Sequence, residues 1–213
     1  MKLEGKKINF IGDSITEGVG VKNPENIYMN RLKRAVGLAE ARNYGVGGTR
    51  IAPQHKPSAY EIWDRDFILR TKEMDSDADV VVVFGGTNDY GHGDAPFGAF
   101  EDRTPETFCG ACHVLFTELI EKYPSAQLVV MTPLHRCGEE TSPEGYPALL
   151  AYVEMIRRVA EYYAIPVLDL YAVSGIQPSV PVLKEKYCPD GLHPNDEGHR
   201  LMAEKLEGFL RAL

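Results

Sequence analysis

The sequence predicts one α/β domain, a three-layer α/β/α sandwich in which helices cover both faces of a parallel sheet of about five strands. Short apolar segments alternate with amphipathic helical segments along the 213 residues. Two of the apolar segments, 80–84 and 128–131, are continuous apolar runs, which is typical of strands that are buried on both faces. No internal repeat, charge run or Gly/Ser-rich linker divides the chain, so we expect a single domain over residues 1–213.

The expected strands follow one another at intervals that leave room for helices between them. The first strand is Ile-Asn-Phe-Ile, and the second is a weaker strand candidate. The third and fourth are the two continuous runs, and the fifth is Pro-Val-Leu-Asp-Leu. In chain order they occupy residues 8–11, 41–44, 80–84, 128–131 and 166–170.

Apolar stripes at helical spacing predict the helices that connect the strands. They cover residues 27–39, 108–119, 149–160 and 202–213. Thr104 is the expected N-cap of the helix over 108–119, with Pro105 at the first helical position. Residues 52–70 are ambiguous, and we expect a loop there with a short helix around 64–70.

Composition and charge exclude several classes of protein. The 31 acidic residues outnumber the 23 basic residues, and the net charge of −8 argues against a nucleic-acid binder, which needs clustered Lys and Arg. Apolar runs such as 80–84 are far shorter than the roughly 20 residues that cross a bilayer, so no membrane insertion is expected. Four cysteines are too few for a secreted disulfide framework, and no export signal follows Met1. We expect a cytoplasmic protein if Met1 is the native start.

Unusual residues follow the first two expected strands, at the edge where ligands gather in such sheets. After the first strand, Gly12-Asp13-Ser14 places a serine hydroxyl near a helix start, beside unpaired backbone N–H groups. The alternative is that Ser14 or Asp13 only caps this helix. After the second strand, the glycines at 45, 47 and 48 let the backbone approach a ligand, and the alternative is a turn without a function.

Two further groups follow the third strand and precede the last helix. Asn88 comes directly after the buried strand 80–84, where an amide can donate to a developing oxyanion, although Asn also favours turns. His193 precedes Pro194 and therefore lies on a loop. Asp190, three residues earlier, can reach the Nδ1–H of His193 and leave Nε2 as a general base. Alone, such a histidine is more often a surface residue.

These groups, in this order, resemble the SGNH (GDSL) hydrolase superfamily, which is named for one Ser, Gly, Asn and His in separate blocks. The first block has Ile15 where the family often has Leu. The matching blocks are Gly12-Asp13-Ser14-Ile15, Asn43-x-Gly45-x-x-Gly48, Gly86-x-Asn88-Asp89 and Asp190-x-x-His193-Pro194. They span residues 12–194 and thus nearly the whole chain.

The resemblance implies a flavodoxin-like SGNH hydrolase fold and a serine ester hydrolase without metal or organic cofactor. Ser14 would be the nucleophile, His193 its base and Asp190 the partner that orients the imidazole. The N–H groups of Ser14 and Gly48 and the amide of Asn88 would form the oxyanion hole.

The expected substrate is a small-molecule acyl ester with a short acyl chain or an O-acetyl group, including esters linked to carbohydrate. The alternatives are a lysophospholipase or thioesterase for longer acyl chains, and a non-catalytic ligand-binding module on the same fold. Weaker candidates for substrate binding, which are alternatively solvated loop residues, are Asp13, Tyr90, His92, His135 and Arg136. Trp63, Tyr162 and Tyr163 are expected to be packing residues.

The segment Cys109-Gly-Ala-Cys112-His113 matches the attachment signature of c-type haem and the spacing of redox or zinc pairs. Cys112 falls on the apolar stripe of the helix over 108–119, where a small buried thiol is normal. We therefore favour core packing over a redox, haem or zinc site.

Overall fold

The computed structural model describes residues 1–142 and 144–213, and its centre is a five-stranded sheet in which every paired strand is parallel. The strand order is β2-β1-β3-β4-β5, the order of flavodoxin-like folds. The strands are β1 (Lys7–Gly12), β2 (Glu40–Gly45), β3 (Val80–Phe84), β4 (Gln127–Met131) and β5 (Val167–Leu168). The predicted α/β class is confirmed, but the last strand has two residues instead of the expected five.

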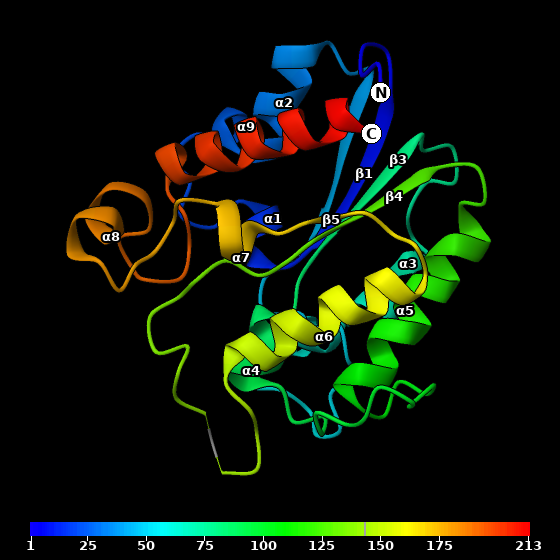
Figure 1. Ribbon diagram of the computed structural model, residues 1–213, viewed down its shortest axis with the longest axis vertical. Coiled ribbons are helices and arrows are strands. Elements are labelled where there is room, and N and C mark those ends of the chain that lie inside the picture. The colour runs from blue at the N-terminus through cyan, green and yellow to red at the C-terminus, as the bar shows by residue number, and fades with distance from the viewer. Residues whose placement is uncertain (143) are drawn as a thin grey trace.

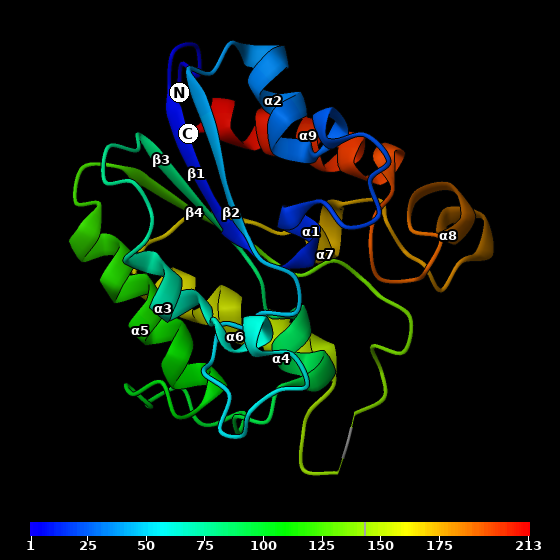
Figure 2. The same cartoon turned by 180° about the vertical axis from the view of Figure 1, so that it is seen from behind.

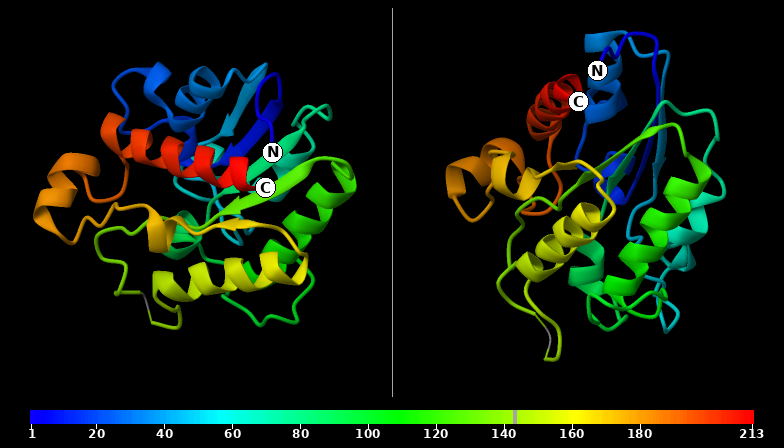
Figure 3. Two further views of the ribbon diagram at one scale, coloured as in Figure 1. Left: turned by 45° about the horizontal axis from the view of Figure 1, so that its top comes forward. Right: turned by 45° about the vertical axis from the view of Figure 1, so that its right-hand side comes forward.

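Helices cover both faces of the sheet (Figures 1 and 3). On one face lie α2 (Tyr28–Val36) and α9 (Asp196–Ala212), and on the other lie α3 (Phe67–Thr71), α5 (Phe108–Lys122) and α6 (Leu149–Tyr162). The side chains of β3 alternate between the two cores: Val80 and Val82 pack on the side of α2 and α9, whereas Val81 and Val83 pack on the side of α5 and α6. Both faces are buried, which explains the continuous apolar run of this strand.

The boundaries of the long helices follow from their caps. The helix α5 begins at Phe108, and its N-cap is Thr107, whose hydroxyl accepts a hydrogen bond from the N–H of Gly110 at 3.1 Å. The expected N-cap Thr104 was therefore wrong by three residues. Two threonines precede this helix, and both fit the capping pattern equally well in sequence. The helix α2 ends earlier than expected, because Gly37 adopts a left-handed conformation (φ 71°) after Val36.

Several short helices lie in the connections, where a segment of one or two turns is too short to display helical periodicity, and among them the sequence indicated only the helix start near Ser14. They are α1 (Ser14–Glu17), α4 (Thr87–His92), α7 (Leu170–Val173), α8 (Pro181–Tyr187) and the 3₁₀ turns Pro24–Asn26 and Glu61–Asp64. Figure 2 shows α8 projecting from the body of the molecule, and none of its residues is buried. No helix among the described residues is long and apolar enough to span a membrane.

The cysteines of the Cys-x-x-Cys-His segment lie inside the core. Cys109 and Cys112 are buried free thiols in α5, and burial raises the pKa of Cys109 to about 12. Such a thiol forms almost no thiolate at neutral pH. The positions of both side chains fit the core-packing interpretation.

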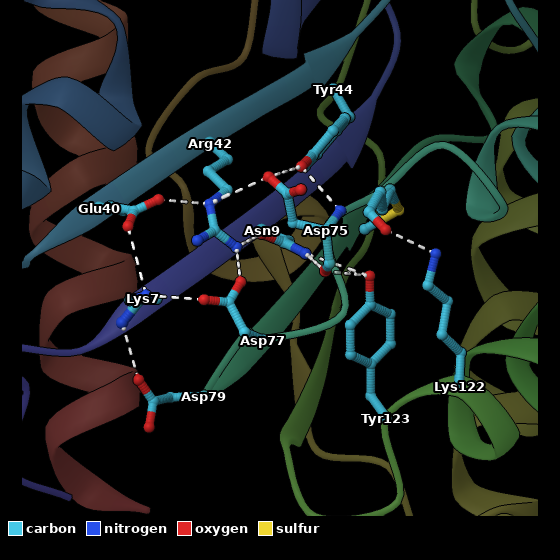
Figure 4. Close-up of polar contacts among 11 residues, drawn as sticks. Lys7, Asn9, Glu40, Arg42, Tyr44, Asp75, Asp77, Asp79, Lys122 and Tyr123 are labelled. Atoms are coloured by element: carbon cyan, nitrogen blue, oxygen red, sulfur yellow. Dashed lines mark hydrogen bonds and ion pairs between the residues drawn. The ribbon is translucent and has the colours of Figure 1, made fainter.

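A polar network holds the edge of the sheet opposite the carboxyl ends of the strands (Figure 4). Arg42 on β2 pairs with Asp77 at 2.6 Å and Glu40 at 2.5 Å, and the buried Asn9 on β1 donates to the carbonyl of Asp75 at 2.8 Å. The ammonium of Lys122 on α5 donates to the carbonyl of Met74 at 2.6 Å. These contacts attach the segment between α3 and β3 to the strands on one side and to α5 on the other.

One buried histidine is held in its neutral form. His199 on α9 is fully buried, its ring stacks on Tyr28 with centroids 5.9 Å apart, and its Nδ1 accepts the N–H of Tyr28 at 3.2 Å. The proton of the neutral ring is therefore on Nε2, for which no partner is found among the described residues. Burial lowers the pKa of His199 from 6.5 to about 4.

We predict that His199 makes the fold sensitive to acid. Between pH 6.5 and about 4 the unfolded chain binds a proton at His199 that the folded chain does not, so stability is lost as the pH falls through this range. The loss is on the order of 3 kcal/mol for the full shift. Urea unfolding at pH 4.5 and 7.5 measures it.

The matched variant is His199→Gln, whose amide can still accept the N–H of Tyr28. Its free energy of unfolding should fall less between the two pH values than that of the wild type. Asp13, whose pKa is raised to about 7, makes the folded state more stable as the pH falls. Because both proteins contain Asp13, its contribution cancels in the difference between them. Equal pH dependence in both proteins would contradict the prediction.

Candidate active site

The site lies at the carboxyl ends of β1 and β3, which are neighbours in the middle of the sheet. The chain leaves β1 towards α2 on one face and leaves β3 towards α5 on the other. This divergence opens a crevice at the point where ligands bind in sheets of this kind. Ser14 begins α1 directly beyond β1, and Asn88 lies in α4 directly beyond β3.

The structure joins Ser14, His193 and Asp190 in one chain of hydrogen bonds. The Oγ of Ser14 lies 3.0 Å from Nε2 of His193, and Nδ1 of His193 lies 2.7 Å from Oδ2 of Asp190. The other oxygen of Asp190 accepts the N–H groups of Leu192 at 2.8 Å and His193 at 2.7 Å. Burial alone would raise the pKa of Asp190, but these hydrogen bonds lower it below its usual value. An ionised Asp190 thus fixes the tautomer in which Nε2 faces Ser14 as an acceptor.

A sharp turn between β1 and α1 sets the position of Ser14. A Cβ on Gly12 would lie 2.0 Å from Oγ1 of Thr16, so only glycine fits there. The side chain of Asp13 caps α1 by accepting the N–H of Ile15 at 3.0 Å. Asp13 is buried, and burial raises its pKa to about 7. Asp13, one of the expected substrate-binding residues, therefore caps the helix that begins at Ser14.

The glycine-rich loop after β2 lies against this turn. Gly48 has a left-handed conformation (φ +75°), and a Cβ on Gly48 would lie 2.2 Å from Cδ1 of Trp63. A Cβ on Gly47 would lie 3.6 Å from Cβ of Ser14, so the loop passes directly beside the serine. In the described part of the chain, the backbone N–H groups of Ser14 and Gly48 have no protein acceptor. Two free donors therefore lie close to the serine hydroxyl.

Asn88 and Asp89 connect α4 to the segment that follows Gly48. The amide of Asn88 donates one N–H to the carbonyl of Thr49 at 2.9 Å, which leaves its second N–H for another acceptor. The carboxylate of Asp89 accepts the N–H groups of Ile51 at 3.0 Å and Ala52 at 2.9 Å. Burial raises the pKa of Asp89 to about 6. Asp89 was not among the expected site residues, and its place in the Gly-x-Asn-Asp block was the signal for it.

Two of the weaker candidates, Tyr90 and His135, form polar contacts with the loop that follows β4. The hydroxyl of Tyr90 donates to the carbonyl of Gly138 at 2.5 Å and is also bonded to the carbonyl of Thr141. The ring of His135 lies 3.8 Å from that of Tyr171, and its Nδ1 lies 2.7 Å from Oε1 of Glu139. These contacts hold the loop over 132–142 and leave both polar groups paired with protein.

Arg136 lies closer to the predicted site. Its Nη1 donates to the carbonyl and hydroxyl of Thr87 at 3.0 and 3.1 Å. Together with Asp13, Leu134 and Leu192 it lines a cavity of about 10 Å³, which is room for about one water molecule. Within the described residues, no group of three or more His, Cys, Asp or Glu side chains is arranged to hold a metal ion.

Trp63 is a residue of the site that the sequence did not identify. It was expected to be a packing residue, and its indole packs on Gly48. The ring of His92, a weaker candidate, lies next to this indole, with ring centroids 5.1 Å apart. Trp63 falls in the ambiguous segment 52–70, where no periodicity predicted its orientation.

The sequence profile of the GDSL-like lipase/acylhydrolase family matches residues 10–201. A search of curated proteins found no significant match.

Solved structures resemble the chain over its whole length. One is 32% identical with a TM-score of 0.88, over 100% of this chain and 99% of its own. A protein from Lactobacillus plantarum is 30% identical with a TM-score of 0.85, over 98% of each chain. An acetyl-xylooligosaccharide esterase from Geobacillus is 23% identical with a TM-score of 0.64, over 99% of this chain and 96% of its own, and shares the fold.

We predict that Gly48→Ala destabilises the protein more than Gly175→Ala. Both glycines have a left-handed φ, +75° and +77°, so both variants incur about 1–2 kcal/mol of backbone strain. A Cβ at Gly48 also overlaps Trp63, whereas a Cβ at Gly175 meets nothing within 4 Å. Urea unfolding of the two variants measures the difference. Equal destabilisation would show that the indole moves away without cost.

Proposed function

Because this chain belongs to the GDSL-like lipase/acylhydrolase family and is an ester hydrolase, we propose that it cleaves carboxylic esters through an acyl-enzyme on Ser14. The observation that carries this proposal is the hydrogen-bonded chain from Ser14 through His193 to Asp190, at 3.0 and 2.7 Å. A serine hydroxyl is a weak nucleophile until a neighbouring base accepts its proton, and His193 is placed to accept it.

The proposed reaction has two halves. In the first, Oγ of Ser14 attacks the acyl carbon while Nε2 of His193 takes the hydroxyl proton, and the carboxylate of Asp190 stabilises the imidazolium. The tetrahedral intermediate collapses, and His193 gives the proton to the departing alcohol. In the second half, water attacks the acyl-enzyme with His193 again as base, and the acid leaves as Ser14 regains its proton.

The oxyanion of each intermediate would be held by three donors: the N–H groups of Ser14 and Gly48 and the free N–H of the Asn88 amide. Support comes from the absence of a protein acceptor for the two backbone groups in the described part of the chain. The bond from Asn88 to the carbonyl of Thr49 fixes the amide before substrate arrives. Donors that are fixed in advance stabilise the intermediate without reorganisation during the reaction.

We propose short acyl chains, including O-acetyl groups on carbohydrate, as the substrate class. The cavity lined by Leu134, Leu192 and Arg136 is only about 10 Å³, room for about one water molecule. This cavity therefore has no room for a long acyl chain. The Geobacillus esterase on the same fold acts on acetylated xylooligosaccharides. Longer-chain lysophospholipase or thioesterase activity is the competing assignment.

Hydrolysis of p-nitrophenyl esters from acetate to decanoate tests the proposal. We expect activity highest on acetate or butyrate, and a loss of at least about 10³-fold in Ser14→Ala with a nearly unchanged melting temperature. A preference for octanoate or longer esters would favour the competing assignment. Normal activity in Ser14→Ala would exclude the acyl-enzyme, and a folded wild type that cleaves no ester would favour a binding module.

We predict that Asn88→Ala lowers kcat by about 10²–10³-fold, the usual effect of removing one oxyanion donor. The KM should change little, because the interaction strengthens mainly in the transition state. Thermal unfolding of the variant controls for the lost bond to Thr49. A loss below about threefold in a folded variant would mean that Asn88 only shapes the turn.

A further inference from the structure

Three ring side chains lie next to one another beside the glycine-rich loop. The ring centroids of Tyr60 and Trp63 are 4.7 Å apart, and those of Trp63 and His92 are 5.1 Å apart. Tyr60 is 61% exposed, His92 is exposed and Trp63 is half-buried. We call Tyr60, Trp63 and His92 the aromatic ledge. Its open surface contrasts with the small cavity lined by Arg136.

A buried arginine holds the aromatic ledge in place. The side chain of Arg50 is 2% exposed. Its Nη1 lies 2.9 Å from Nδ1 of His92, and its Nη2 donates to the carbonyl of Trp63 and the carboxylate of Asp64, both at 3.0 Å. One guanidinium thus contacts the ring of His92 and the backbone of Trp63. These bonds to a buried side chain restrain two of the three ledge residues.

The aromatic ledge borders the reacting centre on the side of β2. The indole of Trp63 lies where a Cβ of Gly48 would be, and the neighbouring Gly47 lies beside Ser14. The cavity lined by Leu134, Arg136 and Leu192 lies on the other side, beyond β3 and β4. The cavity holds about one water molecule, so the larger part of an ester bound at Ser14 has the open aromatic side available.

We propose that the aromatic ledge binds the leaving alcohol of the ester and that this alcohol is a ring-shaped polyol, such as a pyranose. The inference rests on the proposed reaction at Ser14. A pyranose presents a flat face of C–H groups that packs on the electron-rich face of an aromatic ring. Tyr60 is largely exposed, and its hydroxyl can bond a sugar hydroxyl.

Trp63 is the single tryptophan of the chain, so its fluorescence reports on the ledge directly. The test uses Ser14→Ala protein, which cannot turn over, titrated with a methyl β-xylopyranoside and with glycerol as an acyclic polyol. We expect a saturable change in emission with the pyranoside only. Tyr60→Ala added to this background should weaken the apparent affinity at least about fivefold.

The matched control is Tyr162→Ala, since Tyr162 is a similarly exposed tyrosine (58%) on α6. It should leave the titration unchanged. No saturation with the pyranoside, or equal effects of Tyr60→Ala and Tyr162→Ala, would overturn the proposal.

Kinetics on two acetate esters provide the second test. With a monoacetylated methyl xylopyranoside, Tyr60→Ala should raise KM at least about fivefold with kcat nearly unchanged. With ethyl acetate, whose alcohol is too small to cover the ledge, the same variant should stay within about twofold of the wild type. Equal losses on both esters would mean that the ledge supports Gly48 and binds no alcohol, which overturns the proposal.

The two tests also separate this inference from the proposed function. If the pyranoside titrates Trp63 but the wild type cleaves neither ester, the proposed reaction fails and the sugar-binding ledge remains. If both esters are cleaved with no effect of Tyr60→Ala, the reaction remains and the ledge assignment fails.

Discussion

The functional edge of this protein depends on the close backbone contact between the turn after β1 and the loop after β2. A Cβ on Gly45 would lie 2.2 Å from the backbone nitrogen of Glu17, and one on Gly12 would lie 2.0 Å from Oγ1 of Thr16. Glycine at these positions lets the two segments touch without intervening side chains. The same contact brings the free N–H groups of Ser14 and Gly48 to one place, where neither segment alone would form a site.

A buried arginine stabilises this contact between the two segments. The guanidinium of Arg70 on α3 donates to the carbonyl of Gly12 at 3.1 Å and to the hydroxyl of Thr49 at 2.8 Å, and it also bonds the carbonyl of Tyr44. One side chain thus links the ends of β1 and β2 to the loop that carries Gly48. Burial lowers the pKa of Arg70 to about 10, so the group is still charged at neutral pH and balances nearby carboxylates such as Asp13.

The sequence was informative where patterns are regular and where residue types are rare. Apolar runs such as 80–84 predicted the parallel sheet, and the motif blocks predicted which residues would gather at its edge. The sequence did not indicate two kinds of feature. Short helices such as α4 show no helical periodicity. Trp63 contacts Gly48 only because of the way in which segment 52–70 folds. The carbonyl of Trp63 accepts a hydrogen bond from a buried arginine 13 residues away, a contact that no local pattern encodes.

The hydrogen bond between Ser14 and His193 joins residues that are 179 positions apart. Ser14 is made early in synthesis, but His193 becomes available only after almost the whole chain has left the ribosome. Contacts of such long range form late in folding, because the intervening chain must first be ordered. A chain that ends before His193 cannot form this bond, so in the proposed mechanism turnover at Ser14 would report that the chain is complete and folded.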